Sequence, residues 1–491
     1  MAEQVEEPSM RPSDPWGGPK ILTKKRNGAY TWQVIAGSAA LGLVVAAGAV
    51  LAAGPWDNGQ RKAERALAAA GDRTGGAHHG RPTPDGPRPA PSAPAVLPAL
   101  GTTTHDAPQD TAALRDTLAP LIGDPGLGDK VAASVIDTAT GEQLYGQGAT
   151  TPMTPASTIK IATATAALSV LGPDHRIATT AALSPDSRTV TLVGGGDPTL
   201  SRAALRAMAA DTADALREKD RDSVRLAYDI SRYTGPVLHP ISPNVNIAPV
   251  TALMVNEGRV NNTDRGPAKR TDDPAGDAAR TFAAALKKAG VEVTGEPREA
   301  RAADEARTVA THRSAPLDAL VERTLTNSDN DIAEALARQT AIAKGESASF
   351  AGARRAVTNE LKKLKVPMAG AHFADGSGLD RKDRVTPALL TALLARAADP
   401  DRPGLRPVLT GLPIAGFSGT LGGRYAPDAE GTGLIRAKTG TLFGVNSLAG
   451  TVVDRQGRLL AFAFLASGSI DAGQAEPALD ALATALAGTG G

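Results

Sequence analysis

Ser157-Thr158-Ile159-Lys160 is the stretch that decides how this sequence is interpreted. Two further short motifs follow it along the chain, Ser328-Asp329-Asn330 and Lys438-Thr439-Gly440. Each of the three recurs by chance in unrelated proteins, so none is informative alone. Together, in this order and at domain-scale separations, they are typical of a serine acyl-transfer site.

The first motif places an amine next to a hydroxyl. Ser157 and Lys160 lie three residues apart in a helix that we expect from Ser157 to Leu171, so their side chains share one face. Serine is a poor nucleophile unless a base removes its proton, and Lys160 can be that base only if its pKa is lowered. Burial and a second positive charge would lower it, and Lys438 is the candidate for that charge. The helix N-terminus would also favour negative charge developing at Ser157. A serine cap followed by a solvated lysine is the alternative for this motif alone.

The second motif offers a hydroxyl and an amide on either side of Asp329. Ser328 could relay a proton to a leaving amine, and Asn330 could hold the substrate backbone. Ser, Asp and Asn are also the ordinary residues of helix caps, so a plain capping turn is the alternative.

The third motif lies on a strand expected over residues 434–441. Thr439 and Thr441 are two residues apart, so their hydroxyls share one face and could bind a carboxylate. Gly440 has no Cβ, so an extended substrate could approach the strand edge. The backbone N–H groups of Thr441 and Ser157 would form an oxyanion hole. A glycine-containing strand that begins at a surface lysine is the alternative.

Composition excludes several other classes of protein. The net charge of +1 gives no reason to expect nucleic acid, and the absence of cysteine excludes disulfides, thiol nucleophiles and thiolate-bound zinc. Gly194-Gly195-Gly196 lacks the Lys-Ser/Thr of a nucleotide loop, and there is no HExxH metal motif. Asp375-Gly376-Ser377-Gly378-Leu379 does not fit the nucleophile elbow, so we interpret it as a structural turn.

The N-terminal part predicts a membrane anchor. Trp32 to Ala53 carries no formal charge and is long enough to cross a bilayer, which takes about 20 residues. The basic residues Lys20, Lys24, Lys25 and Arg26 precede it, which predicts that the rest of the chain faces outward. Residues 1–31 then form a disordered cytoplasmic tail, and the Pro- and Gly-rich residues 54–105 form a linker. A cleaved signal peptide and a buried core helix are the alternatives, and export follows from the first of these too.

The remaining chain of this 491-residue protein predicts an α+β fold interrupted by an inserted domain. Strands are expected at both ends of the folded part, with helices between them, which favours one antiparallel sheet with a helical layer. We expect a first part over residues 106–175, a smaller inserted α/β-type domain over 176–308, and a second part over 309–491. The expected strands are 130–137, 143–145, 189–193, 434–441, 447–453 and 459–466, and the expected helices are 111–122, 157–171, 202–219, 274–289, a pattern over 316–336, 351–364, 386–398 and 475–486.

Over roughly residues 110–486 the chain resembles the D-alanyl-D-alanine carboxypeptidase/endopeptidase family related to penicillin-binding protein 4, serine peptidases of the S13 type. Besides the three motifs, the resemblance is carried by Leu192–Leu200, Ser328–Glu334, Asp375–Leu379 with Arg384-Val385-Thr386, Gly419-Thr420-Leu421, and Ala437–Leu442. It implies a penicillin-binding/β-lactamase-like transpeptidase fold with the insertion between the first two motifs. It also implies hydrolysis of the terminal D-Ala-D-Ala bond of peptidoglycan stem peptides, and of cross-links as a further activity, without a cofactor.

The resemblance assigns roles to individual residues. Ser157 would be the acylated nucleophile, also acylated by β-lactams, and Lys160 its base. Ser328 and Asn330 would serve proton transfer and substrate positioning, while Lys438, Thr439, Gly440 and Thr441 would bind the substrate carboxylate and backbone. The rival hypotheses are a serine β-lactamase, for which no deacylating carboxylate motif is found, and a catalytically idle wall-binding protein tethered to the cell membrane.

Overall fold

The structure is a computed structural model that describes residues 111–242, 244–469 and 471–489. The predictions for the tail (1–31), the apolar run (32–53) and the linker (54–105) lie outside the described residues. Among the residues that are described, no helix combines the length and the apolar character needed to cross a membrane.

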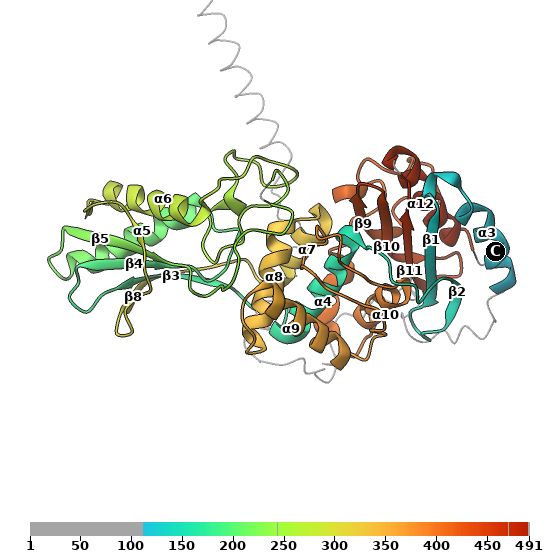
Figure 1. The fold of residues 1–491 in the computed structure, drawn as a ribbon, viewed down its shortest axis with the longest axis horizontal. Coiled ribbons are helices and arrows are strands. Elements are labelled where there is room, and N and C mark those ends of the chain that lie inside the picture. The colour runs from blue at the N-terminus through green and yellow to red at the C-terminus, as the bar shows by residue number, and fades with distance from the viewer. Residues whose placement is uncertain (1–110, 243, 470, 490–491) are drawn as a thin grey trace, which may run out of the picture. The chain divides into compact units, whose positions relative to one another are not determined.

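A five-stranded antiparallel sheet is built from both ends of the described chain, in the order β2-β1-β11-β10-β9 (Figure 1). Its strands are β1 (Lys130–Asp137), β2 (Gln143–Gln147), β9 (Ile435–Leu442), β10 (Val445–Val453) and β11 (Leu459–Ser467). The first strand pairs with the last, with Val135 opposite Phe462, so segments more than 300 residues apart are neighbours. The expected strands at both ends of the folded part are confirmed.

Side chains alternate between the two faces of this sheet, and each face has its own helical cover. On β11, Phe462 and Phe464 join the core under α3 (Thr111–Ile122) and α12 (Ala472–Ala487). Ala461 and Ala463 point to the opposite face, into the core of the remaining helices. The sheet therefore has helices on both faces, where a single helical layer was expected. α3 and α12 form the additional layer, which buries Phe462 and Phe464.

The second helical group holds the first two motifs. Its members are α4 (Lys160–Leu171), α7 (Leu317–Asn327), α8 (Asn330–Ala343), α9 (Phe350–Lys363), α10 (Pro387–Ala398) and the short α11 (Pro407–Thr410). α4 is central to this group, since every residue from Lys160 to Leu168 is buried. Its Ala and Thr side chains are small enough for neighbouring helices to pack on all sides.

One helix prediction needs correction at the motifs. The helix expected from Ser157 begins at Lys160, and residues Ala156–Ile159 form a 3₁₀ turn, η2. The helical pattern over 316–336 is confirmed as two helices with the second motif between them, where Ser328 ends α7 in the left-handed conformation (φ 58°). Asp329 then caps α8 by accepting a hydrogen bond from the Ile332 N–H at 3.0 Å.

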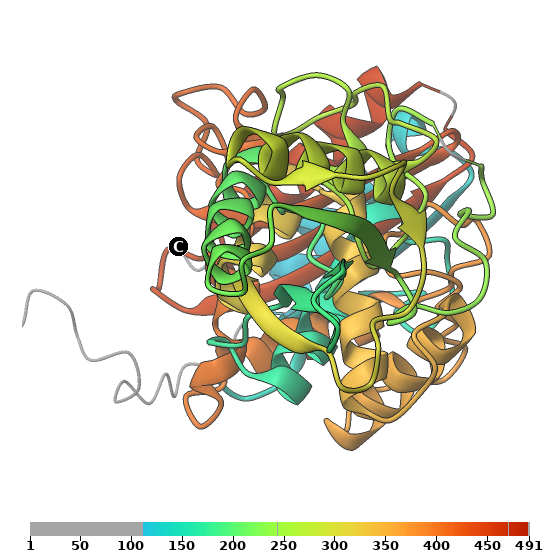
Figure 2. The same ribbon diagram turned by 90° about the vertical axis from the view of Figure 1, so that its left-hand side faces the viewer.

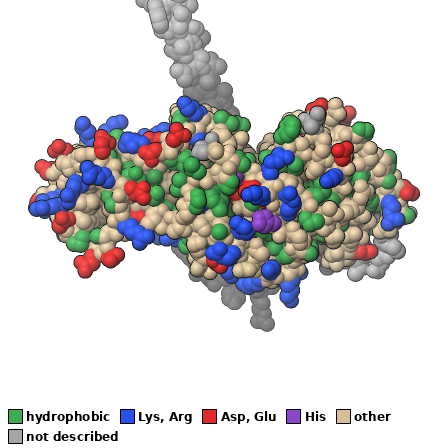
Figure 3. Space-filling view, viewed as in Figure 1, with side chains coloured by type: hydrophobic (Ala, Val, Ile, Leu, Met, Phe, Trp, Pro, Cys, Tyr) green, Lys and Arg blue, Asp and Glu red, His purple; other side chains and the backbone are tan. Residues whose placement is uncertain are grey.

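The insertion carries a second sheet, in the order β6-β5-β4-β3-β8 with β7 beside β5 (Figure 2). The strands are β3 (Ala178–Leu183), β4 (Thr189–Val193), β5 (Ser223–Asp229), β6 (Glu292–Val293), β7 (Arg298–Glu299) and β8 (Arg307–Arg313), so the sheet continues past residue 308. The apolar faces of α5 (Arg202–Arg217) and α6 (Pro274–Lys288) share one core with these strands. Figure 3 shows acidic and basic side chains interspersed over the insertion on this face.

A long loop between β5 and α6 reaches the second motif. Its Ala248 N–H donates to Asp331 Oδ1 at 2.9 Å, and Arg270 Nη2 lies 2.9 Å from Asp331 Oδ2, both pairs being buried. Asp331 belongs to the first turn of α8, so the loop is bonded to the helix that begins with Asn330.

Candidate active site

Ser157 lies in the 3₁₀ turn at the entry to α4 and is half-buried. The preceding Ala156 has a φ of 47°, a left-handed conformation that costs a non-glycine residue about 1 kcal/mol and is typical of functional turns. Hydrogen bonds hold the turn: the Pro155 carbonyl accepts from Thr158 Oγ1 at 2.8 Å and from Ser447 Oγ of β10 at 2.7 Å. The serine therefore sits on a backbone fixed from two sides.

Lys160 is fully buried, and its amine contacts three acceptors. Nζ lies 2.9 Å from Ser157 Oγ, 2.7 Å from Asn330 Oδ1 and 2.5 Å from the Ser377 carbonyl oxygen. An ammonium group has three N–H donors, so these contacts satisfy it completely. When the amine is neutral, its lone pair can instead accept the Ser157 proton.

Burial lowers the pKa of Lys160 to about 8, against the raising effect of several nearby carboxylates, of which Asp375 is the strongest. That lowering corresponds to roughly 3 kcal/mol in favour of the neutral amine, relative to a lysine in water. Of the two expected causes, burial is confirmed as the one that lowers this pKa, and Lys438 is not among the charges that act on it. The effect of charge runs the other way: burial and then the Lys160 charge hold the pKa of Lys438 well below its usual range.

The second motif reaches this amine through Asn330. Its Oδ1 accepts from Lys160, and its Nδ2 donates to the Asn246 carbonyl of the insertion at 3.0 Å. Both half-buried motif side chains, Ser328 and Asn330, border the same cavity as Ser157. The capping interpretation is also correct for Asp329, so capping and a site role coexist in one tripeptide.

The third motif lies on β9, next to the Ser157 turn. Lys438 is fully buried and its Nζ donates to the Thr439 carbonyl at 2.9 Å, whereas Thr441 is exposed. A Cβ added at Gly440 would lie 2.7 Å from the Pro155 oxygen and 3.0 Å from the Ser157 nitrogen, so only glycine fits here without displacement. Because Gly440 has no side chain, β9 can pack directly against the Ser157 turn. This role is in addition to the expected approach of a substrate.

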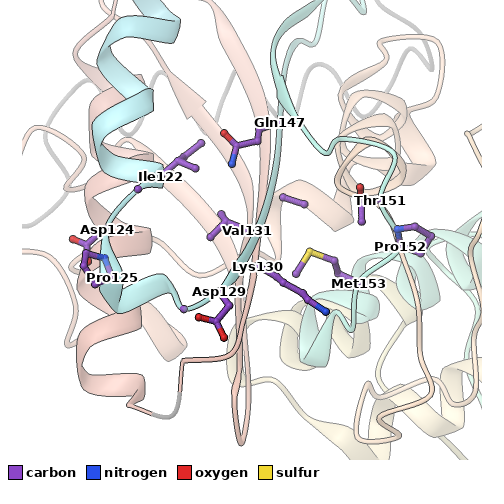
Figure 4. Close-up of a pocket in the computed structure, with 13 residues that line it drawn as sticks. Ile122, Asp124, Pro125, Asp129, Lys130, Val131, Gln147, Thr151, Pro152 and Met153 are labelled. Carbon is purple, nitrogen blue, oxygen red and sulfur yellow. The ribbon is translucent and has the colours of Figure 1, made fainter.

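A cavity of about 360 Å³ connects these groups. Of the predicted residues, Ser157, Ser328, Asn330, Thr439 and Thr441 line it. The insertion supplies another part of the lining with Asn246, Arg259, Gly266, Pro267 and Arg270. A larger cavity of about 520 Å³, between the region of α3 and β1 and the segment at Thr151–Met153, contains none of the motif residues (Figure 4).

Three contributors to the site were not predicted from the sequence. They are the Ser377 carbonyl, the Asn246 carbonyl and the Ser447 hydroxyl. Two of the three act through backbone oxygens, which carry no residue-type signal. For Ser377 the sequence did contain a signal, because it lies in the Asp375–Leu379 landmark that we interpreted as a structural turn.

Two buried clusters within the described part of the chain have spacings that could suit a metal ion, His239/Glu334/Asp375 and Glu257/Asp329/Asp331. Each already has an arginine beside it: Arg338 Nη1 lies 3.5 Å from Glu334, and Arg259 Nε lies 2.7 Å from Glu257. Because these fixed cations oppose a further positive ion, we assign no metal to either cluster.

Comparisons with known proteins agree with this arrangement. The sequence matches the D-Ala-D-Ala carboxypeptidase 3 (S13) family over residues 114–269 and 262–488. It is 38% identical over 420 residues to a carboxypeptidase of Mycobacterium tuberculosis, covering 82% of this chain and 88% of the relative. It is also 30% identical to a D-alanyl-D-alanine carboxypeptidase of an Actinomadura species, covering 76% of this chain and 84% of the relative.

The fold agrees with that of a solved structure. Penicillin-binding protein 4 of Haemophilus influenzae superposes with a TM-score of 0.63 at 22% identity, covering 76% of this chain and 98% of that protein. The penicillin-binding fold expected from the sequence is thereby confirmed. The chain belongs to the S13 family of serine D-Ala-D-Ala carboxypeptidases.

Proposed function

We propose that this chain hydrolyses the terminal D-Ala-D-Ala bond of peptidoglycan stem peptides through an acyl-enzyme on Ser157. The observation that carries the assignment is a single contact: a fully buried lysine amine, with its pKa lowered to about 8, lies 2.9 Å from a serine oxygen at the edge of a cavity. A lysine of this kind can act as a general base near neutral pH. Family membership supports the D-Ala-D-Ala substrate.

The proposed acylation step uses groups already in position. Neutral Lys160 takes the proton of Ser157 as the serine oxygen attacks the carbonyl carbon of the penultimate D-alanine. The N–H groups of Ser157 and Thr441 stabilise the oxyanion, and the close approach of β9 to the Ser157 turn supports this pairing. The proton then passes to the amine of the departing D-alanine, with Ser328 and Asn330 lining its path. Water hydrolyses the ester and releases the shortened peptide.

The substrate carboxylate is proposed to bind at the third motif. Thr439 and Thr441 line the cavity, and the Lys438 amine lies beneath them, donating to the Thr439 carbonyl. A carboxylate bound here would favour a proton on Lys438, whose pKa is otherwise held low by burial and by the Lys160 charge. Positive charge on Lys438 would in turn favour the neutral, basic form of Lys160. We infer that substrate binding and activation of the base are coupled in this way.

The test pairs covalent labelling with product release. Incubation with a fluorescent penicillin followed by intact-mass analysis should give one adduct per chain, and a D-Ala-D-Ala pentapeptide should release D-alanine. Ser157→Ala should abolish both, since the hydroxyl is the only group in the proposal that forms the covalent bond. Unchanged D-alanine release by this variant would exclude Ser157 as the nucleophile.

The same experiment separates the peptidase from a β-lactamase. A peptidase of this kind holds the penicilloyl ester for a long time, because rapid release would need an added base that activates water, and the sequence shows no carboxylate motif typical of such a base. An adduct that disappears within seconds, with many penicillin molecules consumed per chain, would favour the β-lactamase instead. Activity on cross-linked dimers, measured alongside the pentapeptide, would establish whether the chain is also an endopeptidase.

We further propose that residues 32–53 anchor the chain in the cell membrane, with the peptidase domain outside. The proposal rests on the uncharged run and the basic residues before it. Full-length protein should stay with the membrane fraction after alkaline carbonate extraction, and a variant lacking residues 32–53 should not. A mature N-terminus found after residue 54 would show a cleaved signal peptide instead.

A further inference from the structure

The third acceptor of the Lys160 amine belongs to a turn built around the Asp375 carboxylate, with Glu334 Oε1 also accepting from the Gly376 and Ser377 N–H groups at 2.9 and 3.0 Å. The Ser377 carbonyl accepts from Lys160, and three backbone N–H groups of this turn, those of Ser377, Gly378 and Asp380, donate to Asp375 at 3.0, 2.6 and 2.7 Å. The Ser377 hydroxyl also donates to Asp375, at 3.2 Å. The direction of the Ser377 carbonyl therefore depends on where the Asp375 carboxylate is held.

Asp375 is in turn held by a residue of the insertion. His239 Nε2 lies 2.8 Å from Asp375 Oδ2, and both side chains are fully buried. The imidazole edge packs on Phe350 of α9, with ring centroids 5.4 Å apart and an interplanar angle of 80°. The His239 ring is thus fixed between Asp375 and α9, and three hydrogen bonds, through Asp375 and Ser377, connect it to the amine of Lys160.

A second contact ties another Lys160 acceptor to the insertion. Asn330 Oδ1 accepts from Lys160, while its Nδ2 donates to the Asn246 carbonyl at 3.0 Å. Two of the three acceptors around the base are therefore held by the same long loop, at residues 239 and 246. The remaining acceptor is the nucleophile Ser157 itself.

The charges around His239 favour its protonated form. Burial alone would lower the pKa of His239, but the hydrogen bond that it donates to Asp375 and the charges of Glu334, Asp375 and Asp380 raise it. Arg338, on the same helix as Glu334, supplies the opposing positive charge. Burial and the Asp375 charge also raise the pKa of Asp383, whose Oδ1 accepts from the Ala374 N–H at 2.6 Å.

We propose that His239 is a positioning residue for the catalytic base: through Asp375 and the Ser377 carbonyl it holds the Lys160 amine against Ser157, so that acylation depends on how the insertion is docked. The proposal rests on the acyl-enzyme function above. The insertion thereby takes part in the chemistry of the site, in addition to lining its cavity.

Two substitutions separate the hydrogen bond from mere packing. His239→Leu removes the donor, and His239→Gln keeps an N–H that can reach Asp375. The measurement is the rate constant of acylation by a fluorescent penicillin across pH, with attention to the alkaline plateau, where Lys160 is neutral. We expect the plateau to fall about 10- to 100-fold in His239→Leu, as for a misplaced catalytic group, and to stay within about threefold of the native value in His239→Gln.

The acidic limb of the pH profile of acylation reports the effect of the His239 charge on the pKa of Lys160. Both variants remove a positive charge near Lys160, so its pKa should rise and the limb should move to higher pH in both. Gln339→Leu is the matched control, since Gln339 is buried and joins α8 to the insertion by donating to the Gly195 carbonyl at 2.8 Å and to the Tyr233 hydroxyl at 3.4 Å. It should lower the unfolding temperature without changing the plateau.

Three outcomes would overturn the proposal: a native plateau in His239→Leu, a plateau in His239→Gln as low as in His239→Leu, or an equal loss in Gln339→Leu. A native chain that is not acylated at all would instead contradict the proposed function. His239 could then still be tested by NMR titration of ε-¹³C-labelled lysines, with the Lys160 signal assigned by its loss in Lys160→Met. Because His239→Leu and His239→Gln lose the same charge, equal Lys160 pKa values in the two variants would overturn the positioning role in that case.

Discussion

The two lysines of the site are equally buried but have very different surroundings. The Lys160 amine contacts three oxygens, contributed by the nucleophile, by α8 and by the Asp375 turn. For Lys438 the hydrogen bond found goes to the carbonyl of the next residue, Thr439, on an edge strand whose Thr441 is exposed. One amine is held by segments from across the fold, and the other lies just beneath an open strand edge.

This difference suggests a division of labour. A group that transfers a proton must be fixed relative to its partner within a few tenths of an ångström, which needs acceptors on several independent elements. A group that neutralises an incoming carboxylate needs only to be near the cavity and poorly solvated. The Lys160 side of the site is accordingly the one suited to chemistry, and the β9 side is suited to recognition. Each prediction below changes one side and leaves the other intact.

The largest effect should come from removing the base. Lys160→Met keeps the length of the buried side chain but has no amine, so the acylation rate constant with penicillin should fall about 10²- to 10⁴-fold. The rate is measured by stopped-flow fluorescence or by intact mass over time. Circular dichroism and the unfolding temperature show whether the variant is folded. A folded variant that is acylated at the native rate would exclude Lys160 as the base.

The next effect is the pH dependence of the acylation rate, which should follow the pKa of Lys160 and not that of Lys438. Burial lowers the pKa of Lys160 to about 8, and the base is competent only when neutral. The acylation rate should therefore rise with pH, by about tenfold per unit below pH 8, and level off above it. The rate rises with pH because Lys160 becomes a competent base only when it loses its proton.

Lys438→Gln tests which amine carries the proton in the free site. Because the pKa of Lys438 is the more strongly depressed, the proton should reside on Lys160, and removing Lys438 should leave the acidic limb near its native position. The alkaline plateau of the acylation rate is expected to fall in this variant, because binding of the substrate carboxylate is weakened. A limb displaced by a full pH unit would show that Lys438 is charged in the free enzyme and repels the Lys160 proton.

The same contrast explains what could be predicted from the sequence. The strands around Lys438 and Thr441 were predicted closely, because short runs of mostly apolar residues bounded by turn residues, as in β10 and β11, are a local property. The start of α4 was predicted three residues early, since the 3₁₀ turn at Ser157 depends on contacts with Ser447 and β9 that no local pattern reveals. The neighbours Asn246 and Ser377 were not predicted as site residues, because both act through carbonyls carried on irregular loops.

The smallest effect should come from the recognition side. The Thr441 hydroxyl is exposed and lines the cavity, and it lies 3.4 Å from Glu476 Oε1, too far for a strong hydrogen bond. Thr441→Val keeps the shape and the backbone N–H but loses the hydroxyl, so kcat/KM for a pentapeptide with a free C-terminal carboxylate should fall about 5- to 20-fold. The same peptide ending in a carboxamide should lose less, because its terminus carries no charge to bind. Thr439→Val is a less clean comparison, since that hydroxyl already donates to Thr420 Oγ1 at 2.8 Å. Equal losses on the carboxylate and carboxamide peptides would mean that the Thr441 hydroxyl acts on the geometry of β9, and the carboxylate would then have to be recognised by other groups of the cavity.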